Sequence, residues 1–334
     1  INQTAQLIGN DHYKSEGSLS LPSCELWQNL GSAIYHEARN EWVYSENLYR
    51  DVLIIDSTIS SVYKNLAFVL MQQSLIEGSG GQIALDKLYN AETILKRAHR
   101  LNPTDTDVYR LLGTLYIHHE WWNRAEEAFL KAFQGNQEDP FLYFFISRLH
   151  PSRFRRFGFR TRESLLKNAI KINPALVWAY LSLGEEYYFK QKYRESEKII
   201  HQLLTICPNS GDGLFMLGKL YLLQNEWVKM IRCYERILKV TPNFPDVLYN
   251  MGIMAYHERK LDQALTFFKR AMELDNNSGA AFYRAKIFEL MGEVDSAAVM
   301  YRERLKLRKG PYDNYANEAA ENLRIYLQTK EATH

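Results

Sequence analysis

The sequence predicts an all-α protein built from stacked helical hairpins, and three observations support this prediction. A glycine recurs at intervals of 34 residues, at Gly184, Gly218 and Gly252. Apolar residues follow each glycine at spacings of three and four, which place them on one face of a helix. A proline or asparagine then closes each repeat. Because a single hairpin cannot bury its apolar face, a repeat of this length indicates neighbouring copies that share a continuous core.

Composition places the chain among ordinary globular proteins and gives no overall charge for binding an anionic polymer. The 334 residues are 46% hydrophobic, and 41 basic residues nearly balance 39 acidic ones. The balance argues against nucleic acid or membrane binding by net charge. No apolar run is long enough to span a bilayer, and no signal segment is apparent. These features, together with the low number of cysteines, favour the cytoplasm, and the compartment stays open. The chain starts at Ile1 and is therefore compatible with a piece of a larger protein.

The N-terminal third of the sequence follows the repeat pattern less closely. Residues 1–22 are expected to form a degenerate helix and a linker. Residues 23–138 follow as divergent and regular hairpins, of which the first contains Gly31 and is two residues too long between its helices. The second is split by an insert near 74–87 whose segment EGSGGQ is typical of a loop. The third, around Gly113, is regular.

The remaining chain divides into three further segments. Residues 139–174 form an irregular hairpin with three surplus residues before its second helix. Residues 175–309 hold the regular repeats, the last with Ala285 in place of the glycine. Residues 310–334 begin with a Gly-Pro break and continue as an amphipathic helix. We expect this helix to cap the array, because an end repeat must present a polar outer side.

The order of residue types in each repeat resembles the tetratricopeptide repeat family: leucine or an aromatic residue, Leu-Gly, tyrosine, a small residue, an aromatic residue, alanine and proline. The resemblance covers roughly nine tenths of the chain. It implies a right-handed superhelical solenoid of about seven to eight hairpins with a C-terminal capping helix. It also implies a non-catalytic protein that binds a peptide or helix of a partner in a concave groove lined by the first helices of the hairpins.

Helical phase, counted from each glycine, predicts which side chains face that groove. The predicted set is Arg110, Phe144, Arg148, Trp178, Leu181, Glu185, Tyr188, Phe215, Lys219, Tyr249, Tyr256, Phe282 and Lys286. The same phase also includes Asp107, Thr114, His118, Phe141, Phe189, Asp212 and Ile253. Aromatic and arginine side chains commonly carry interface energy, so the row predicts a partner site. The alternative is that these rings pack between adjacent repeats.

The segment RFRRFGFR and its flanks form the most unusual local sequence. Six arginines and three phenylalanines lie between Arg148 and Arg162. We define the basic loop as Arg153, Arg155, Arg156, Arg160 and Arg162. Such a segment suits an acidic stretch of a protein partner, or nucleic acid or an anionic membrane. The alternative is a solvated turn whose phenylalanines pack under the next repeat.

Catalytic and metal-binding patterns are not found in the sequence. No HExxH accompanies the histidines, and the glycines at 78–81 lack the lysine and serine of a phosphate loop. We therefore expect no enzyme activity, cofactor or metal. The lysine-asparagine-arginine clamp of chaperone-binding relatives is absent too. Only Asn29, Asn65 and Asn250 match the asparagine ladder of sugar-transferase relatives, so a ladder is rejected.

The sequence thus predicts a scaffold or adaptor of a multi-protein assembly, with protein or peptide partners that include an acidic segment. A second hypothesis is that the chain is the regulatory or substrate-recruiting arm of a larger enzyme, including a membrane-associated one. A third, weaker hypothesis is RNA binding through the basic loop.

Overall fold

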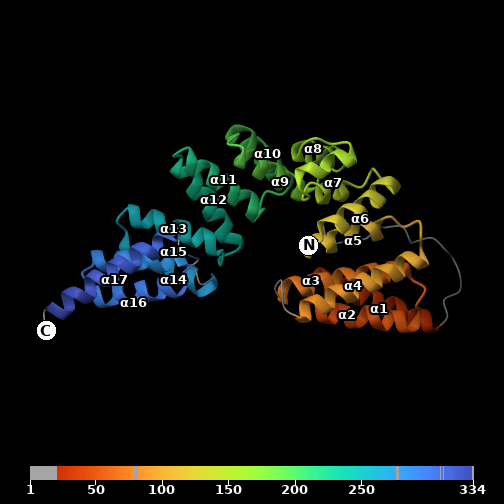
Figure 1. Ribbon diagram of the computed structural model, residues 1–334, viewed down its shortest axis with the longest axis horizontal. Helices are drawn as coiled ribbons and strands as arrows, with labels where there is room; N and C mark the ends of the chain where they lie inside the picture. The colour runs from red at the N-terminus through yellow and green to blue at the C-terminus, as the bar shows by residue number, and fades with distance from the viewer. Residues whose placement is uncertain (1–20, 78–81, 276–277, 309, 311, 333–334) are drawn as a thin grey trace. The chain divides into compact units, whose positions relative to one another are not determined.

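The computed structural model describes residues 21–77, 82–275, 278–308, 310 and 312–332. Most of the expected N-terminal helix and the glycine-rich part of the insert lie outside these residues. Throughout the described part of the chain, regular structure is helical (Figure 1). The elements are α1 (Leu21–Ala38), α2 (Trp42–Ile55), α3 (Ser60–Glu77), α4 (Gln82–Leu101), α5 (Asp107–His118), α6 (Trp122–Gly135), α7 (Pro140–Ile146), η2 (Pro151–Phe157), α8 (Arg162–Ile172), α9 (Val177–Phe189), α10 (Tyr193–Ile206), α11 (Gly211–Leu223), α12 (Trp227–Val240), α13 (Pro245–His257), α14 (Leu261–Asp275), α15 (Ser278–Leu290), α16 (Val294–Lys306) and α17 (Asn314–Ala332).

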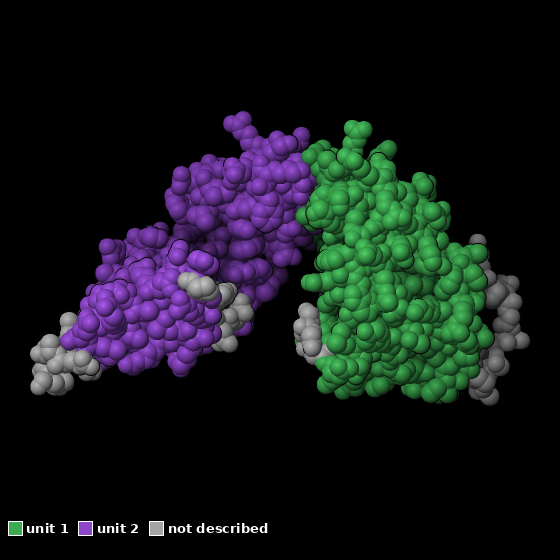
Figure 2. Space-filling model, in the orientation of Figure 1, with its two compact units in different colours: residues 1–179 green, residues 180–334 purple. Residues whose placement is uncertain are grey.

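The helices pack as consecutive hairpins, which confirms the predicted fold class. Helix α1 packs on α2, α3 on α4, α5 on α6 and α7 on α8, and the same pairing recurs from α11 to α16. Helix α17 packs against both α15 and α16, so the expected capping helix is present. The chain divides into two compact units, residues 1–179 and 180–334 (Figure 2). The division falls inside α9.

The repeat glycines lie where the two helices of a hairpin approach most closely. A Cβ atom added to Gly218 would stand 2.4 Å from the ring of Tyr234 on α12, and one added to Gly252 would stand 2.7 Å from Phe268 on α14. Both rings are fully buried. The large side chain sixteen residues after each glycine therefore occupies the space that a methyl group would need.

Replacing Gly218 with alanine is expected to lower the free energy of unfolding of unit 2. Overpacking a core costs about 1–3 kcal/mol, and the better helix propensity of alanine offsets about 1 kcal/mol of this. Gly31 provides the matched control, because nothing lies within 4 Å of a Cβ added there. Gly31→Ala should be neutral or stabilising by up to about 1 kcal/mol. Urea denaturation followed by circular dichroism measures both, and effects of the same sign would contradict this packing.

The turn between the two helices of a hairpin uses one residue with a left-handed backbone. These residues are Asn40, Glu120, Gln191, Asn225, Arg259 and Gly292, with φ between 57° and 78°. In each case the next backbone N–H donates to a carbonyl five residues earlier, as Glu226 N does to Tyr221 O at 2.9 Å. Since Tyr221 is the third residue after Gly218, the repeat pattern positions the turn as well as the interface. A non-glycine residue here costs about 1 kcal/mol or more, which the closed hairpin offsets.

An asparagine–tyrosine hydrogen bond joins successive hairpins. Asn65 Nδ2 on α3 donates to Tyr49 Oη on α2 at 3.2 Å, and Asn250 on α13 donates to Tyr234 on α12 at the same distance. The tyrosines are fully buried, so the amide gives each buried hydroxyl a partner. Two of the three asparagines considered for a ladder, Asn65 and Asn250, thus hold neighbouring repeats together.

Candidate partner-binding site

A cavity of about 380 Å³ opens in unit 1. It lies among the first helices of successive hairpins, α3, α5 and α7, the turn before α2, and the start of α9. Its lining comprises Asn40, Trp42, Lys64, Asn65, Phe68, Met71, Gln72, Asp107, Arg110, Leu111, Thr114, His118, Phe144, Phe145, Arg148 and Trp178. This volume is within the range of about 300–1,000 Å³ that is typical of ligand pockets. We call it the unit 1 pocket.

Aromatic rings make up the apolar side of the unit 1 pocket. Phe144 on α7 lies against Trp178 on α9, with ring centroids 6.0 Å apart and planes inclined by 35°. On the other side, Trp42 meets Phe68 edge to face at 6.3 Å. Phe144 and Trp178 are only partly buried, so both rings offer apolar surface to a ligand. Such pairs of large rings are the side chains that most often dominate binding energy.

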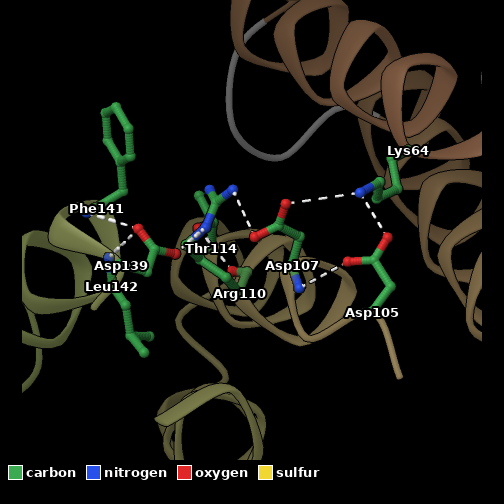
Figure 3. Close-up of polar contacts among 8 residues, drawn as sticks. All are labelled: Lys64, Asp105, Asp107, Arg110, Thr114, Asp139, Phe141 and Leu142. Atoms are coloured by element: carbon green, nitrogen blue, oxygen red, sulfur yellow. Dashed lines mark hydrogen bonds and ion pairs between the residues drawn. The ribbon is translucent and has the colours of Figure 1, made fainter. Parts of the chain in front are cut away.

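A row of ion pairs crosses the polar side of the pocket (Figure 3). Lys64 Nζ on α3 lies 2.5 Å from Asp105 Oδ2 and 3.6 Å from Asp107 Oδ2. Arg110 on α5 reaches Asp107 Oδ1 with Nη2 at 3.5 Å and Asp139 Oδ2 with Nε at 2.7 Å. The row therefore ties α3, α5 and the start of α7 together.

Asp139 has two structural roles at the end of this row. Its Oδ1 accepts hydrogen bonds from the backbone N–H of Phe141 at 2.9 Å and of Leu142 at 3.3 Å, so it caps α7. Burial raises the pKa of its carboxyl group, against the opposing attraction of Arg110. Arg110, predicted to face a partner, is 3% exposed. Its charge is already engaged with two carboxylates and positions the helices of the site.

Arg148 stands apart from this row. The residue is exposed at the pocket, and within the described ranges no carboxylate pairs with it. Partial burial, with the nearby positive charge of Arg162 as a second cause, lowers the pKa of its guanidinium group. Burial and the charge of Arg148 also lower the pKa of His118, which is therefore neutral at pH 7. Among the described residues that line the pocket, Arg148 is thus the positively charged side chain without a carboxylate partner, and it lies beside the aromatic wall.

A segment of the chain matches the sequence model of a known protein family. Residues 214–248, which cover α11, α12 and the start of α13, match the family model described as tetratricopeptide repeat. This segment is the part of the chain that matches the family's sequence model, and the fold of the described residues is that of tetratricopeptide-type helical-repeat structures. No curated protein matches its sequence significantly.

Solved tetratricopeptide-type structures share the fold at low sequence identity. A chain of the APC/C hetero-tetramer Cut9-Hcn1 matches with a TM-score of 0.61 at 14% identity, over 90% of this protein and 55% of that chain. Yeast Tom70 matches with a TM-score of 0.57 at 14% identity, over 97% and 67%. The human IFIT1 dimer with m7Gppp-AAAA also gives 0.57 at 14% identity, over 92% and 76%. This chain thus spans about half the length of the first of these.

In the part of the chain that the structure describes, no helix has both the length and the apolar character needed to cross a bilayer. Nor do the described residues bring together three histidine, cysteine or acidic side chains in a metal-binding arrangement.

The predicted groove residues of α9 beyond Trp178 lie in unit 2 together with those of α11, and Lys219 joins the two helices. Lys219 Nζ lies 4.8 Å from the ring centre of Tyr188 and 5.9 Å from that of Phe215. Phe215 is partly buried and packs against Phe244. Leu181 and Glu185 are also partly buried. These side chains form a partly buried surface in unit 2.

Toward the C-terminus, the predicted row merges with the core. Phe282 is 4% exposed, and its ring lies 4.9 Å from that of Tyr315 on α17. Tyr249 and Tyr256 both contact the ring of Tyr283. Lys286 Nζ lies 3.3 Å from Glu289 and 3.6 Å from Glu318. Phe282 therefore packs inside the array, because the capping helix covers a face that helical phase alone leaves open.

The basic loop is built into the irregular hairpin as η2 and its flanks. Phe154 and Phe157 are buried, and Phe157 meets Phe133 of the preceding α6 edge to face at 5.7 Å. Arg153 and Arg156 both pair with the buried carboxylate of Glu126 on α6, the latter at 2.8 Å. Arg155 and Arg160 are exposed, and Arg162 is partly buried. The phenylalanines thus pack into the structure as in the alternative interpretation, although the ring contact is with the preceding hairpin.

Sequence reasoning missed Trp42, Lys64 and Phe68 as pocket residues. These residues belong to the first two hairpins, where an overlong turn and an insert interrupt the 34-residue spacing. Helical phase could not be counted from a glycine there. The remaining signal was the resemblance of VYKNLAFVLM to a first helix, which places Lys64 and Phe68 one turn apart on the same side.

Proposed function

We propose that this chain is a non-catalytic adaptor that binds a segment of a protein partner in the unit 1 pocket. The observation that carries the proposal is the Phe144–Trp178 pair, which keeps two large rings partly open beside a 380 Å³ cavity. The ion-pair row supports it, because fixed helices offer a preorganised surface that loses little entropy on binding. The fold supports it as well, since a chain of similar fold comes from the APC/C hetero-tetramer Cut9-Hcn1.

The RNA hypothesis receives less support from the same residues. Phe154 and Phe157 are buried, so they offer no face on which a base could stack. Arg153 and Arg156 are neutralised in part by Glu126. A peptide partner therefore fits the available surface better than a single-stranded nucleic acid.

The proposal is tested by selecting peptides from a random 12-residue phage library on the full chain. The tightest selected peptide is then titrated by fluorescence anisotropy. Trp178→Ala should weaken its binding at least about tenfold, because removing a central aromatic anchor costs about 2 kcal/mol or more. Trp122→Ala is the matched control: Trp122 is a partly exposed tryptophan of unit 1 that does not line the pocket, and its loss should change affinity less than about twofold.

Peptides whose affinity is unchanged by both Trp178→Ala and Phe144→Ala would overturn the proposal. Circular dichroism of each variant checks that the hairpins remain folded. The regulatory-arm hypothesis uses the same pocket and differs only in what is attached to the chain or its partner.

A further inference from the structure

Arg148 is the feature of the unit 1 pocket that most restricts its ligand. The charges of the polar wall are satisfied within the protein: Asp107 lies between Lys64 and Arg110, and Arg110 also holds Asp139. Arg148 has no such partner in the described part of the chain, and it lies beside the Phe144–Trp178 wall. A cation next to apolar rings favours a ligand that brings its own negative charge.

We infer that the unit 1 pocket recognises a peptide segment in which an aromatic side chain adjoins a carboxylate. The aromatic ring packs against Phe144 and Trp178, and the carboxylate binds the guanidinium group of Arg148. This inference rests on the proposed function, and it adds the chemistry by which the partner is chosen. Arginine suits a carboxylate because its planar donors form paired, charge-assisted hydrogen bonds.

The neighbouring charges agree with an anionic group at this position. His118 faces Arg148 and is neutral at pH 7, so it adds no competing positive charge and offers a polar ring to the ligand. The positive charge of Arg162 acts on Arg148 from the α8 side and reinforces attraction for an anion. Asp107 is the carboxylate of the pocket lining, and Lys64 and Arg110 neutralise it.

The size of the pocket favours a peptide over a nucleic acid, and so does the fact that, among its described lining residues, Arg148 is the cation without a carboxylate partner. A volume of 380 Å³ accommodates one aromatic side chain and a carboxylate. Nucleic acid binding depends on several phosphate contacts by lysine or arginine, which give it a steep dependence on salt. Arg148, the unpaired arginine among the described lining residues, does not by itself provide several phosphate contacts.

Two small probes test the inference directly. Indole-3-acetate carries an aromatic ring and a carboxylate, and indole-3-acetamide is the same molecule with a neutral amide. Both are titrated into the full isotope-labelled chain, and affinity is measured from NMR chemical-shift changes. The acetate should bind about tenfold tighter than the acetamide, because a charge-assisted hydrogen bond is worth at least this factor in a partly buried site.

Arg148→Gln should reduce the difference between the two probes to less than about twofold, since the variant retains donors but loses the charge. Arg97→Gln is the matched control, because Arg97 is an exposed arginine of the same unit outside both the pocket lining and the basic loop. It should preserve the tenfold difference. Peptides selected on the wild-type chain should carry an acidic residue next to an aromatic one, and Arg148→Gln should weaken them.

The outcomes separate this inference from the proposed function. Equal binding of both probes, lost in Trp178→Ala and unaffected by Arg148→Gln, would overturn the acidic requirement and leave the peptide pocket intact. Probes and peptides that bind independently of both Trp178 and Arg148 would overturn both, whereas failure of indole-3-acetate to bind the wild-type chain would overturn the acidic requirement alone. Salt-sensitive binding of a single-stranded oligonucleotide that displaces the probes would instead identify a nucleic acid site.

Discussion

Replacing Arg110 with alanine is expected to lower the free energy of unfolding of unit 1 by about 3–5 kcal/mol. The side chain is almost fully buried, and its removal leaves the carboxylate of Asp139 inside the protein without its cation. Burial already raises the pKa of Asp139 while Arg110 is present, so desolvation outweighs the attraction even in the intact pair. Hydrogen exchange of the α5 and α7 amides measures the loss locally, which is suitable because repeat arrays do not always unfold in one step.

A double variant distinguishes a lost pair from a lost packing contact. Arg110→Met with Asp139→Asn replaces the ion pair with uncharged side chains of similar size, and the asparagine retains an oxygen that can cap α7. Most of the lost stability should return, because replacing a buried pair by uncharged groups is often neutral. Arg155→Ala is the surface control and should change stability by less than about 0.5 kcal/mol. A double variant as unstable as Arg110→Ala would contradict the electrostatic explanation.

The first hairpin is expected to lose stability as the pH rises from 4.5 to 7. Glu37 on α1 is 3% exposed, and burial raises the pKa of its carboxyl group from 4.5 to about 7 even though the hydroxyl of Tyr49 donates to it at 2.5 Å. A group with a raised pKa in the folded state stabilises that state below its unfolded pKa, and this contribution is lost as the pH passes the folded value. At about 1.4 kcal/mol per pH unit, the loss amounts to about 3 kcal/mol, with no further change from Glu37 above about pH 7.

Glu37→Gln is the control for this pH dependence. Glutamine remains neutral over the whole range and still offers Tyr49 a carbonyl oxygen, so the variant should lack the Glu37 contribution. Urea denaturation at pH 5 and pH 8, monitored with a probe on α2, compares the two proteins. The comparison removes the titration of His118 and other groups that both proteins share. Parallel pH profiles for wild type and variant would show that Glu37 is ionised throughout.

The fold could be predicted from local spacing because each hairpin is specified by residues close in sequence. Gly218 and Tyr234 are sixteen residues apart and belong to one hairpin, so their contact follows from the repeat itself. Five of the left-handed turn residues lie seven residues after the repeat position, as Asn225 does after Gly218, whereas Asn40 lies nine residues after Gly31 in the overlong first hairpin. Where the spacing is interrupted, as in the first two hairpins, the prediction did not include Trp42 and Phe68 among the site residues.

The candidate site depends on residues that the repeat does not relate. Helical phase predicted that Phe144 and Phe282 both face the groove. In the structure, Phe144 borders an open cavity, whereas Phe282 lies under α17. Phase describes the direction in which a side chain leaves its helix, and it says nothing of what lies opposite. Arg110 and Arg148 were likewise both predicted to face the groove. The structure distinguishes them, because two carboxylates pair with Arg110.

The sequence by itself determined the helical hairpins, their close approach at glycine and the capping helix, because these depend on spacings of three, four and 34 residues within a continuous stretch of chain. Only the tertiary structure decided which aromatic rings are core and which charge is uncommitted. Burial and charge pairing depend on side chains from separate hairpins, as when Lys64 of α3 meets Asp107 of α5. Those encounters arise from stacking, so the unit 1 pocket, and Arg148 as its arginine without a carboxylate partner among the described residues, could be recognised only once the hairpins were packed together.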